Sequence, residues 1–492
     1  MPTFLDLNYQ QSYLNLADTL YTRVQPSGLS NPKLVISSRE VCQLLGVDHD
    51  CLKQPETLEM LSGNAVLDIW QPLAMKYTGH QFGHYNPDLG DGRGLLLAEV
   101  VKQGKSWDLH LKGAGKTPYS RQGDGRAVLR SSIREFLVSE ALAALDIPTT
   151  RALAVVASDT PVYRESKETG AMLLRVTPSH IRFGHFEFLS FTQQHQELKQ
   201  LCDHVINKHY PELTSISDDK QRYHDFFHIT LEKTAKLMAK WQAVGFNHGV
   251  MNTDNMSILG KTFDFGPYAF LDDYDQHFIC NHSDPQGRYR FDQQPNIANW
   301  NLAVLAQALL PLCNKEDLIN SLDQYSKIFK TEFFHIMCQK LGLSLDNHSV
   351  QDWEPLISKT LSMLHTSRLD YTNFLRDLSH IEQPETNKYW REQSLDISGY
   401  DIWYEAFIKP LQALTNKQKI ERAAAMDKVN PKYILRNYLA QEAIEAAEKG
   451  DYTLVNKLHS VLKHPFDEQP ENQTYAQLPP DWGKHLDISC SS

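Results

Sequence analysis

The sequence contains no apolar stretch long enough to cross a membrane, and none of its seven cysteines forms a C-x-x-C pair. The first absence argues against a membrane protein. The second argues against a zinc site and favours reduced, buried thiols. Residues 1–8 also lack the basic side chains of a signal or transit peptide. We therefore expect a cytoplasmic protein.

The chain also has no excess of positive charge. Its formal net charge is −11 at pH 7, which argues against nucleic acid as a main partner but leaves room for a local basic pocket that binds phosphates. With 41% hydrophobic and 22% charged residues, the composition is that of a globular protein. A chain of 492 residues can form roughly two to four average domains or one large two-lobed enzyme, and we expect a monomer.

The stretch with the clearest chemistry is residues 248–266. His248 is followed seven residues later by Asn255, and a D-F-G sequence begins nine residues further on at Asp264. Protein kinases show this spacing between their H-R-D-x-x-x-x-N loop and their D-F-G motif, and there the Asn and the Asp hold Mg²⁺ on the nucleotide phosphates. Val250 occupies the position of the kinase catalytic Asp. The sequence therefore predicts a metal site without the usual base.

A lysine and a glutamate upstream match another part of the kinase nucleotide site. Residues 107–112 alternate apolar and polar side chains, as a half-buried strand does, and end at Lys112. An apolar helical pattern follows over residues 126–145, and Glu135 lies on it. In kinases a strand lysine paired with a helix glutamate positions the nucleotide phosphates. We therefore predict a structural ion pair between Lys112 and Glu135.

Two glycine-rich turns flank the predicted strand. Gly90, Gly92 and Arg93 belong to a G-D-G-R-G sequence, where backbone N–H groups and the arginine could hold phosphates. The alternative for this turn is a plain hairpin. Asp124 and Gly125 lie in the second turn, directly before the predicted helix. That turn is either an anion site at the helix N-terminus or a simple turn in which Asp124 is the cap.

Two arginines occur among apolar residues. Arg175 lies in a strand pattern of Met, Leu and Val, and Arg182 follows within the sequence H-I-R-F-G. A buried guanidinium needs a partner. One alternative is a carboxylate of the core, and the other is a bound phosphate, because the guanidinium fork fits phosphate oxygens.

Longer motifs occur along the chain in a fixed order. They are G-D-G-R at 90–93, L-K-G-A-G-x-T-P-Y-S-R at 111–121, G-D-G-R-A-V-L-R-S-S-I-R-E-F-L at 123–137, H-I-R-F-G at 180–184 and H-G-V-M-N-T-D-N-M-S-I-L-G at 248–260. With these motifs the chain closely resembles the selenoprotein O family over nearly its whole length. Some members of that family carry selenocysteine at the position of Cys490.

The resemblance implies an α+β, protein-kinase-like fold with two lobes that lacks the usual catalytic Asp. On this fold we place an N-terminal extension at residues 1–60, which look mostly helical, and an N-lobe with nucleotide-binding loops at 61–185. A C-lobe with the catalytic and metal-binding loops follows at 186–330. A helical C-terminal region with a tail occupies 331–492.

The resemblance also implies an activity. Members of the family transfer AMP from ATP to hydroxyl side chains of proteins, and bacterial members are reported to transfer UMP with Mn²⁺. ATP is expected to bind in the reverse of its orientation in kinases, with the α-phosphorus open to a Ser, Thr or Tyr hydroxyl of a protein substrate. Mg²⁺ or Mn²⁺ is the expected cofactor, and UTP is a second candidate substrate.

Matching motif positions carry the family's roles to individual residues. Asp254 is the expected proton acceptor, and Asn255 and Asp264 are the expected metal ligands. The residues expected to bind nucleotide are Gly90, Gly92, Arg93, Lys112, Asp124, Gly125, Arg175, Arg182 and Asp264. In a reversed nucleotide, Arg175 and Arg182 would hold the γ-phosphate, which favours the phosphate alternative for both arginines.

Two other functions stay open at this point. One is a conventional protein kinase with a displaced base, and the other is a non-catalytic pseudokinase that binds ATP and scaffolds partners. A separate hypothesis concerns regulation. Cys280, which follows the D-F-G motif, and Cys490, in the polar tail, could form a disulfide under oxidation. The alternative is two unrelated thiols.

Overall fold

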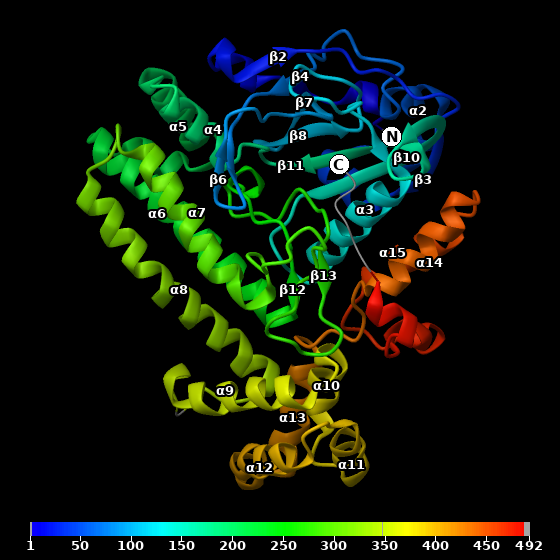
Figure 1. The fold of residues 1–492 in the computed structure, drawn as a ribbon, viewed down its shortest axis with the longest axis vertical. Coiled ribbons are helices and arrows are strands. Elements are labelled where there is room, and N and C mark those ends of the chain that lie inside the picture. Colours follow the sequence, from blue (N-terminus) through cyan, green and yellow to red (C-terminus); the bar gives the residue numbers. More distant parts are fainter. Residues whose placement is uncertain (1, 347, 487–492) are drawn as a thin grey trace.

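The computed structural model describes residues 2–346 and 348–486. The first part of the chain forms an antiparallel sheet in the order β2-β4-β7-β8-β11-β10-β3, with β1 paired to β7 and β9 paired to β11 (Figure 1). Its strands are β1 (Tyr9–Gln10), β2 (Tyr21–Arg23), β3 (Lys33–Ser37), β4 (Leu73–Met75), β7 (Gly94–Lys102), β8 (Lys105–Lys112), β9 (Ala127–Val128), β10 (Arg151–Tyr163) and β11 (Lys167–Thr177).

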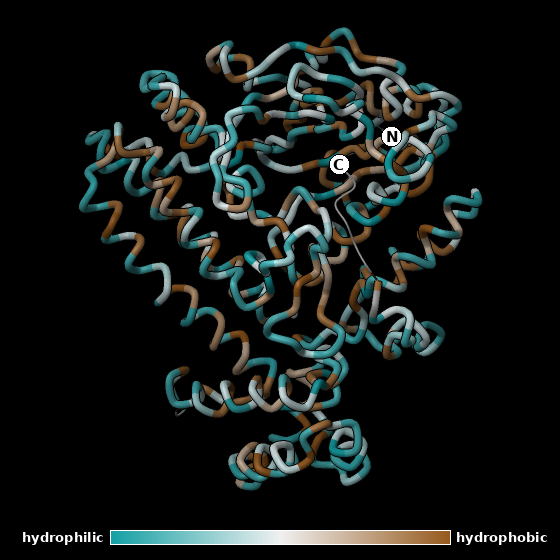
Figure 2. The backbone as a smooth tube through the Cα atoms, viewed as in Figure 1, coloured by the Kyte–Doolittle hydropathy of each residue, from teal (hydrophilic) through white to brown (hydrophobic). Residues whose placement is uncertain are grey.

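Both faces of this sheet are buried. In β11, Leu173 packs into one hydrophobic core together with helix α3 (Leu129–Ala144), whereas Leu174 packs into a second core with α1 (Arg39–Leu45) and α2 (Pro55–Leu61). Successive side chains of a strand point to opposite faces, so a strand covered on both faces needs apolar residues at almost every position. Figure 2 shows the resulting brown segments in the sheet.

The prediction that residues 1–60 are mostly helical is confirmed only in part, because these residues form α1, α2 and short 3₁₀ helices but also strands. They contribute β1, β2 and β3 to the sheet, and β3 pairs with β10 along one edge. Strands of two to five residues carry too little periodicity to be read from sequence, because their conformation depends on the neighbouring strand. Ser38 caps α1, since its side chain accepts a hydrogen bond from the N–H of Val41 at the start of the helix.

The second lobe is helical and is organised around α6. This helix follows the N-cap Asp218 and ends at Gly245, which has a left-handed φ of 74°. The chain then enters the loop that contains the proposed metal ligands. The elements of this lobe are α4 (Phe183–Phe191), α5 (His195–His209), α6 (Asp219–Val244), β12 (Phe246–Asn247), β13 (Ala269–Phe270), α7 (Gln294–Leu309) and α8 (Lys315–Leu341).

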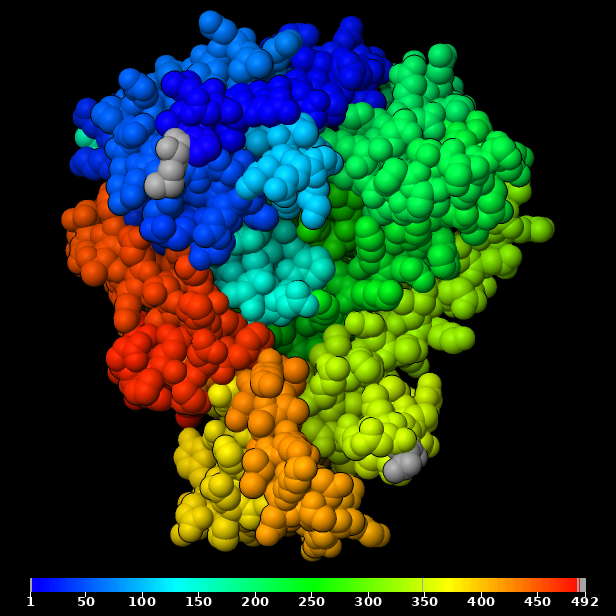
Figure 3. Space-filling view, turned by 180° about the vertical axis from the view of Figure 1, so that it is seen from behind, coloured from blue at the N-terminus to red at the C-terminus, as the bar shows by residue number. Residues whose placement is uncertain are grey.

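The C-terminal region is helical, as predicted, and divides into two groups that lie apart (Figure 1). The first shares a hydrophobic core with the C-terminal end of α8 and contains α9 (Val350–Ser367), α10 (Tyr371–Asp377), α11 (Pro384–Gln393), α12 (Ile397–Ile408) and α13 (Asn416–Asp427). The second, α14 (Asn437–Glu448) and α15 (Thr453–Leu462), returns to the first lobe. There Asn456 donates a hydrogen bond to the carbonyl of Val35 at 3.0 Å. Figure 3 shows these orange and red helices beside the blue N-terminal segments.

No helix within residues 2–346 and 348–486 has both the length and the apolar character that a membrane span requires. The structure thus has the predicted α+β, two-lobed organisation, with the sheet in one lobe and α6 at the centre of the other.

Candidate functional site

A cleft of about 660 Å³ is lined by residues of both glycine-rich turns, the sheet and the loop that follows α6. Every residue that the sequence assigns to nucleotide, metal or proton transfer lines it: Gly90, Gly92, Arg93, Lys112, Asp124, Gly125, Arg175, Arg182, Asp254, Asn255 and Asp264. The structure therefore brings these residues together in one place.

A chain of buried charges runs along one side of the cleft. Glu135 of α3 accepts hydrogen bonds from Lys112 at the end of β8 and from Arg175 of β11. Arg175 also pairs with Asp264 at 2.8 Å, and Asp264 in turn accepts from Arg182. These partners alternate in sign, so each buried charge has an opposite charge beside it. Side chains from distant parts of the sequence are thereby locked into one network.

The network shifts the ionisation of its members. Burial lowers the pKa of Lys112 to about 8, because the ammonium loses its hydration and lies near the charges of Arg175 and Arg93, although Glu135 opposes the shift. Burial acts against ionisation of Asp264, but Arg182, Arg175 and Lys112 hold its pKa far below the usual range. Asp264 is therefore a carboxylate and available as a metal ligand.

Arg182 is held from several sides. Its guanidinium lies 4.5 Å from the ring centre of Tyr77 and 4.6 Å from that of Phe263, which is the geometry of a cation–π contact. It also donates to the backbone carbonyl of Asp254 at 2.7 Å. With Asp264 as its carboxylate partner, Arg182 links the strand side of the cleft to the loop that carries Asp254.

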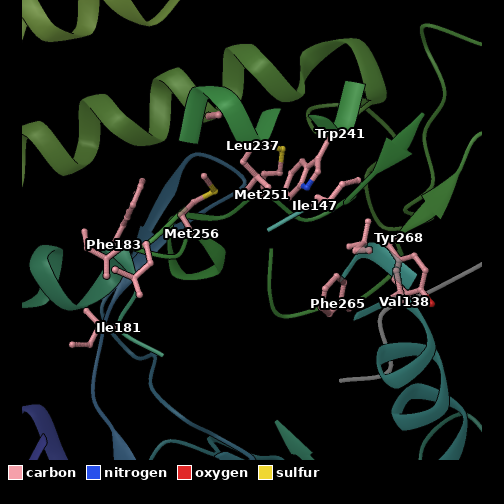
Figure 4. Packing of buried hydrophobic residues seen from close by; sticks show 14 of the residues in the cluster. Val138, Ile147, Ile181, Phe183, Leu237, Trp241, Met251, Met256, Phe265 and Tyr268 are labelled. Carbon is pink, nitrogen blue, oxygen red and sulfur yellow. The ribbon is translucent and has the colours of Figure 1, made fainter. Parts of the chain in front are cut away.

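The loop after α6 is fixed by hydrophobic packing on both sides of the site. Met251 lies against Leu237 and Trp241 of α6, and Met256 lies near Phe183 of α4 (Figure 4). Between these anchors, residues Thr253–Asn255 form a short 3₁₀ turn. The polar side chains of this turn therefore have a defined position at the edge of the cleft.

Asp254 is buried, and in the described part of the chain only one of its two carboxylate oxygens accepts a hydrogen bond. Its Oδ2 accepts from the side chain of Gln81 at 3.2 Å, and its Oδ1 has no hydrogen-bond partner among the described residues. Burial raises the pKa of Asp254 to about 7, against the lowering effect of Arg182. Because Asp254 lines the cleft, its carboxylate is suited to accept a proton there.

The cleft also contains a donor set that fits a hard divalent cation. The amide N–H₂ of Asn255 donates to the carbonyl of Val250 at 3.0 Å, which leaves its amide oxygen as a ligand. Asp264 supplies a carboxylate in the same cleft. Oxygen-only donors of this kind match Mg²⁺ and Mn²⁺.

A second group of metal-ligand residues lies outside this cleft. Among the described residues, Glu40, Glu140 and His459 are the one set of three whose ligand atoms come close together. Both carboxylates already have cationic partners, Lys463 for Glu40 and Arg151 for Glu140. The cleft is therefore the better place for the metal that a nucleotide-binding site requires.

Comparison with known proteins identifies the family. A family model described as "Protein adenylyltransferase SelO" matches residues 3–463. The chain belongs to the SelO family. The resemblance seen in the sequence is thereby confirmed, and the chain is a nucleotidyltransferase.

Relatives from bacteria match the SelO-family chain from end to end. "Protein nucleotidyltransferase YdiU" of Stutzerimonas stutzeri (strain A1501) is 54% identical over 494 residues, and that of Azotobacter vinelandii (strain DJ / ATCC BAA-1303) is 51% identical over 493 residues; both alignments cover 100% of each chain. The protein of the same name from Pseudomonas fluorescens (strain SBW25) is 50% identical over 488 residues, with 99% of each chain covered.

In this SelO-family protein the segment between the two glycine-rich turns packs against both of them. Thr117 Oγ1 donates to the carbonyl of Asp91 at 2.7 Å, and a methyl group at Gly125 would lie 2.1 Å from the carbonyl oxygen of Gly115. Asp124 binds the guanidinium of Arg164 at 2.9 and 3.0 Å. The first turn is thus more than a plain hairpin, because the segment between the turns holds it in place.

Replacing Gly125 by alanine should weaken ATP binding and stability together. Gly125 has a φ of +71°, so any side chain costs about 1 kcal/mol there, and its methyl group would also collide with the backbone of Gly115. The matched control is Gly104→Ala, which has a φ of +75° but no atom within 4 Å of the new methyl. Melting temperatures and ATP dissociation constants of both variants test this. If Gly125→Ala and Gly104→Ala lowered the melting temperature and the ATP affinity equally, the predicted collision with Gly115 would be contradicted.

Sequence reasoning missed two polar residues that shape the cleft. His110 and Asp91 line it, and His110 Nε2 lies 3.2 Å from Asp91 Oδ2. Asp91 also accepts from the N–H of Met75 at 3.1 Å. The G-D-G-R sequence contained Asp91. The direction in which the Asp91 side chain points depends on how β4, β7 and β8 pair, and the sequence does not show this pairing.

Of the two cysteines in the redox hypothesis, the structure describes Cys280. Cys280 is a buried free thiol whose Sγ lies 3.6 Å from the carbonyl of Asn247. Burial raises the pKa of Cys280, so the reactive thiolate is disfavoured in this state. Cys490 lies outside the described residues.

Proposed function

We propose that this protein transfers AMP from ATP to the hydroxyl groups of Ser, Thr or Tyr side chains of proteins, with Mg²⁺ or Mn²⁺ as cofactor. UTP with Mn²⁺ as a second nucleotide belongs to the same proposal. The observation that carries it is one cleft that is lined by the buried cations Lys112, Arg175 and Arg182 and by the carboxylate of Asp254. Val250 occupies the position of the kinase base in the same cleft.

The charges of the cleft support a reversed nucleotide. The γ-phosphate carries the most negative charge of ATP, and the deeply buried guanidinium groups of Arg175 and Arg182 are suited to receive it. With the terminal phosphate held there, the α-phosphorus is the one left for an acceptor near Asp254. Lys112 would bind the phosphates between the two ends.

The proposed reaction is a single displacement at phosphorus. The acceptor hydroxyl oxygen attacks the α-phosphorus, a new P–O bond forms, and the bond from the α-phosphorus to the bridging oxygen breaks, so that pyrophosphate leaves. The hydroxyl proton moves to the carboxylate of Asp254. Arg175 and Arg182 stabilise charge on the leaving pyrophosphate. A metal held by Asn255 and Asp264 would neutralise phosphate charge when bound.

Labelled ATP separates this proposal from its alternatives. The protein is incubated with a bacterial lysate, divalent metal and ATP labelled on either the α- or the γ-phosphate. Protein labelling by α-labelled ATP alone supports AMP transfer. Labelling only from the γ-position would mean a conventional kinase with a displaced base, and ATP binding without protein labelling would mean a pseudokinase scaffold. Mass spectrometry of labelled proteins then identifies the acceptor residue.

We further propose that Cys280 can form a regulatory disulfide with Cys490. Cys280 packs beneath the catalytic loop, since a methyl group at Gly249 would lie 2.5 Å from its Sγ. A disulfide at this position would therefore displace the loop that carries Asp254 and Asn255. Non-reducing peptide mapping after oxidation tests the pairing, and two free thiols would contradict it.

A further inference from the structure

A short hairpin of the first lobe reaches across to the loop that follows α6 and carries Asp254 and Asn255. It consists of β5 (Gly79–Gln81) and β6 (His84–Asn86), joined by a two-residue turn. The turn residues Phe82 and Gly83 both have positive φ, 51° and 85°, which is the tight geometry that matches the twist of paired strands. Gln81 stands next to this turn and lines the cleft.

Several hydrogen bonds dock the hairpin on the loop. The N–H of His80 donates to Thr253 Oγ1 at 2.7 Å, and the N–H of Phe82 donates to the hydroxyl of Tyr289 at 2.9 Å. Tyr289 in turn donates to Asn252 Oδ1 at 2.6 Å. These contacts hold the hairpin on Asn252 and Thr253, directly before Asp254 in the sequence, so the position of Gln81 relative to Asp254 is fixed.

Gln81 itself is oriented by its neighbour on the opposite strand. The amide of Asn86 donates to Gln81 Oε1 at 3.1 Å, which directs the N–H₂ group of Gln81 to Asp254 Oδ2 at 3.2 Å. The backbone carbonyl of Asp254 is held separately by Arg182. Gln81 is therefore the side chain that fixes how the carboxylate of Asp254 is rotated.

We propose that Gln81 is a positioning residue for the proton acceptor. By binding Oδ2 of Asp254, it fixes the rotation of the carboxylate relative to the acceptor hydroxyl, and Asn86 keeps Gln81 in the orientation that donates. The inference rests on the proposed function, because it gives Gln81 a role in the same transfer step. A base held in one orientation has a higher chance of being aligned when the hydroxyl attacks.

The variant Gln81→Met tests this role, since methionine keeps the length of the side chain and removes the donor. With an acceptor protein identified by α-label, we expect kcat to fall by roughly tenfold or more, while the KM for ATP and the melting temperature stay near wild-type values. Gln81→Glu should lower kcat further, because its carboxylate repels Asp254. His84→Ala, an exposed change on the same hairpin, is the matched control.

A double-mutant cycle distinguishes positioning from general damage to the hairpin. Asn86→Ala alone should lower kcat by roughly threefold, because Gln81 loses its orienting contact, but it should have no further effect in the Gln81→Met background. Additive losses of kcat in the double variant would overturn the inference. Losses of ATP affinity and stability as large as the loss of kcat would also overturn it. So would a wild-type kcat in Gln81→Met. If the wild type itself transfers no AMP, the proposed function fails, and the inference fails with it.

Discussion

AMP transfer by the variant Asp264→Asn is expected to be about 10³-fold slower than that of the wild type. The substitution keeps the shape of the side chain, and asparagine tolerates the left-handed φ of 59° found at this position. It removes the negative charge that binds Arg182 and Arg175 and that would bind the metal. Initial rates with α-labelled ATP, measured over a series of Mg²⁺ and Mn²⁺ concentrations, test the prediction.

Asp272→Asn provides a matched control for this change. Asp272 also pairs with a buried arginine, Arg436, and its side chain is 20% exposed against 18% for Asp264, but it does not line the cleft. The control should lose stability while keeping its dependence on metal concentration. In the wild type, a chelator should abolish transfer and added metal should restore it. Transfer by Asp264→Asn at more than a tenth of the wild-type rate would contradict the role assigned to Asp264.

The variant Glu135→Gln is expected to lose both stability and transfer. Glu135 is the shared carboxylate between Lys112 and Arg175, so its neutralisation leaves two buried cations without their common partner. Removing one partner of a buried ion pair costs about 3 kcal/mol or more, and we expect transfer to fall by roughly 100-fold because both cations lose their fixed positions. Chemical denaturation and α-label assays measure the two effects.

Glu140→Gln separates these two effects. Glu140 lies on the same helix, is equally buried and pairs with Arg151, but neither residue of this pair lines the cleft. Its loss should lower stability by a similar amount and change the rate of transfer by only a few-fold. If the two variants lose transfer equally, Glu135 acts through stability alone and the proposed role of Lys112 and Arg175 is weakened.

The parts of the fold that the sequence predicted best are those with long, regular patterns. The helical pattern over residues 126–145 predicted the helix that the structure shows as α3, and the alternation at 107–112 predicted β8. The short strands of residues 1–60 were missed, because two to five residues give no clear period.

The spacing of Asn255 and Asp264, together with the long family motifs, was sufficient to select the cleft residues from the linear sequence. Such motifs identify chemistry because each position must supply one particular ligand or turn. They do not show which group each side chain contacts. The sequence left a carboxylate and a phosphate as alternatives for Arg175 and Arg182, and the structure pairs both arginines with carboxylates; the phosphate contact stays a proposal.

The sequence by itself determined the family, the two-lobed α+β class and the residues of the site, since these depend on local order and spacing along the chain. Only the tertiary structure placed Glu135 between two cations and set Gln81 against Asp254. Those contacts join residues more than twenty positions apart. They arise because strand pairing and burial set the direction of each side chain, and burial makes every charge depend on the partner that folding brings to it.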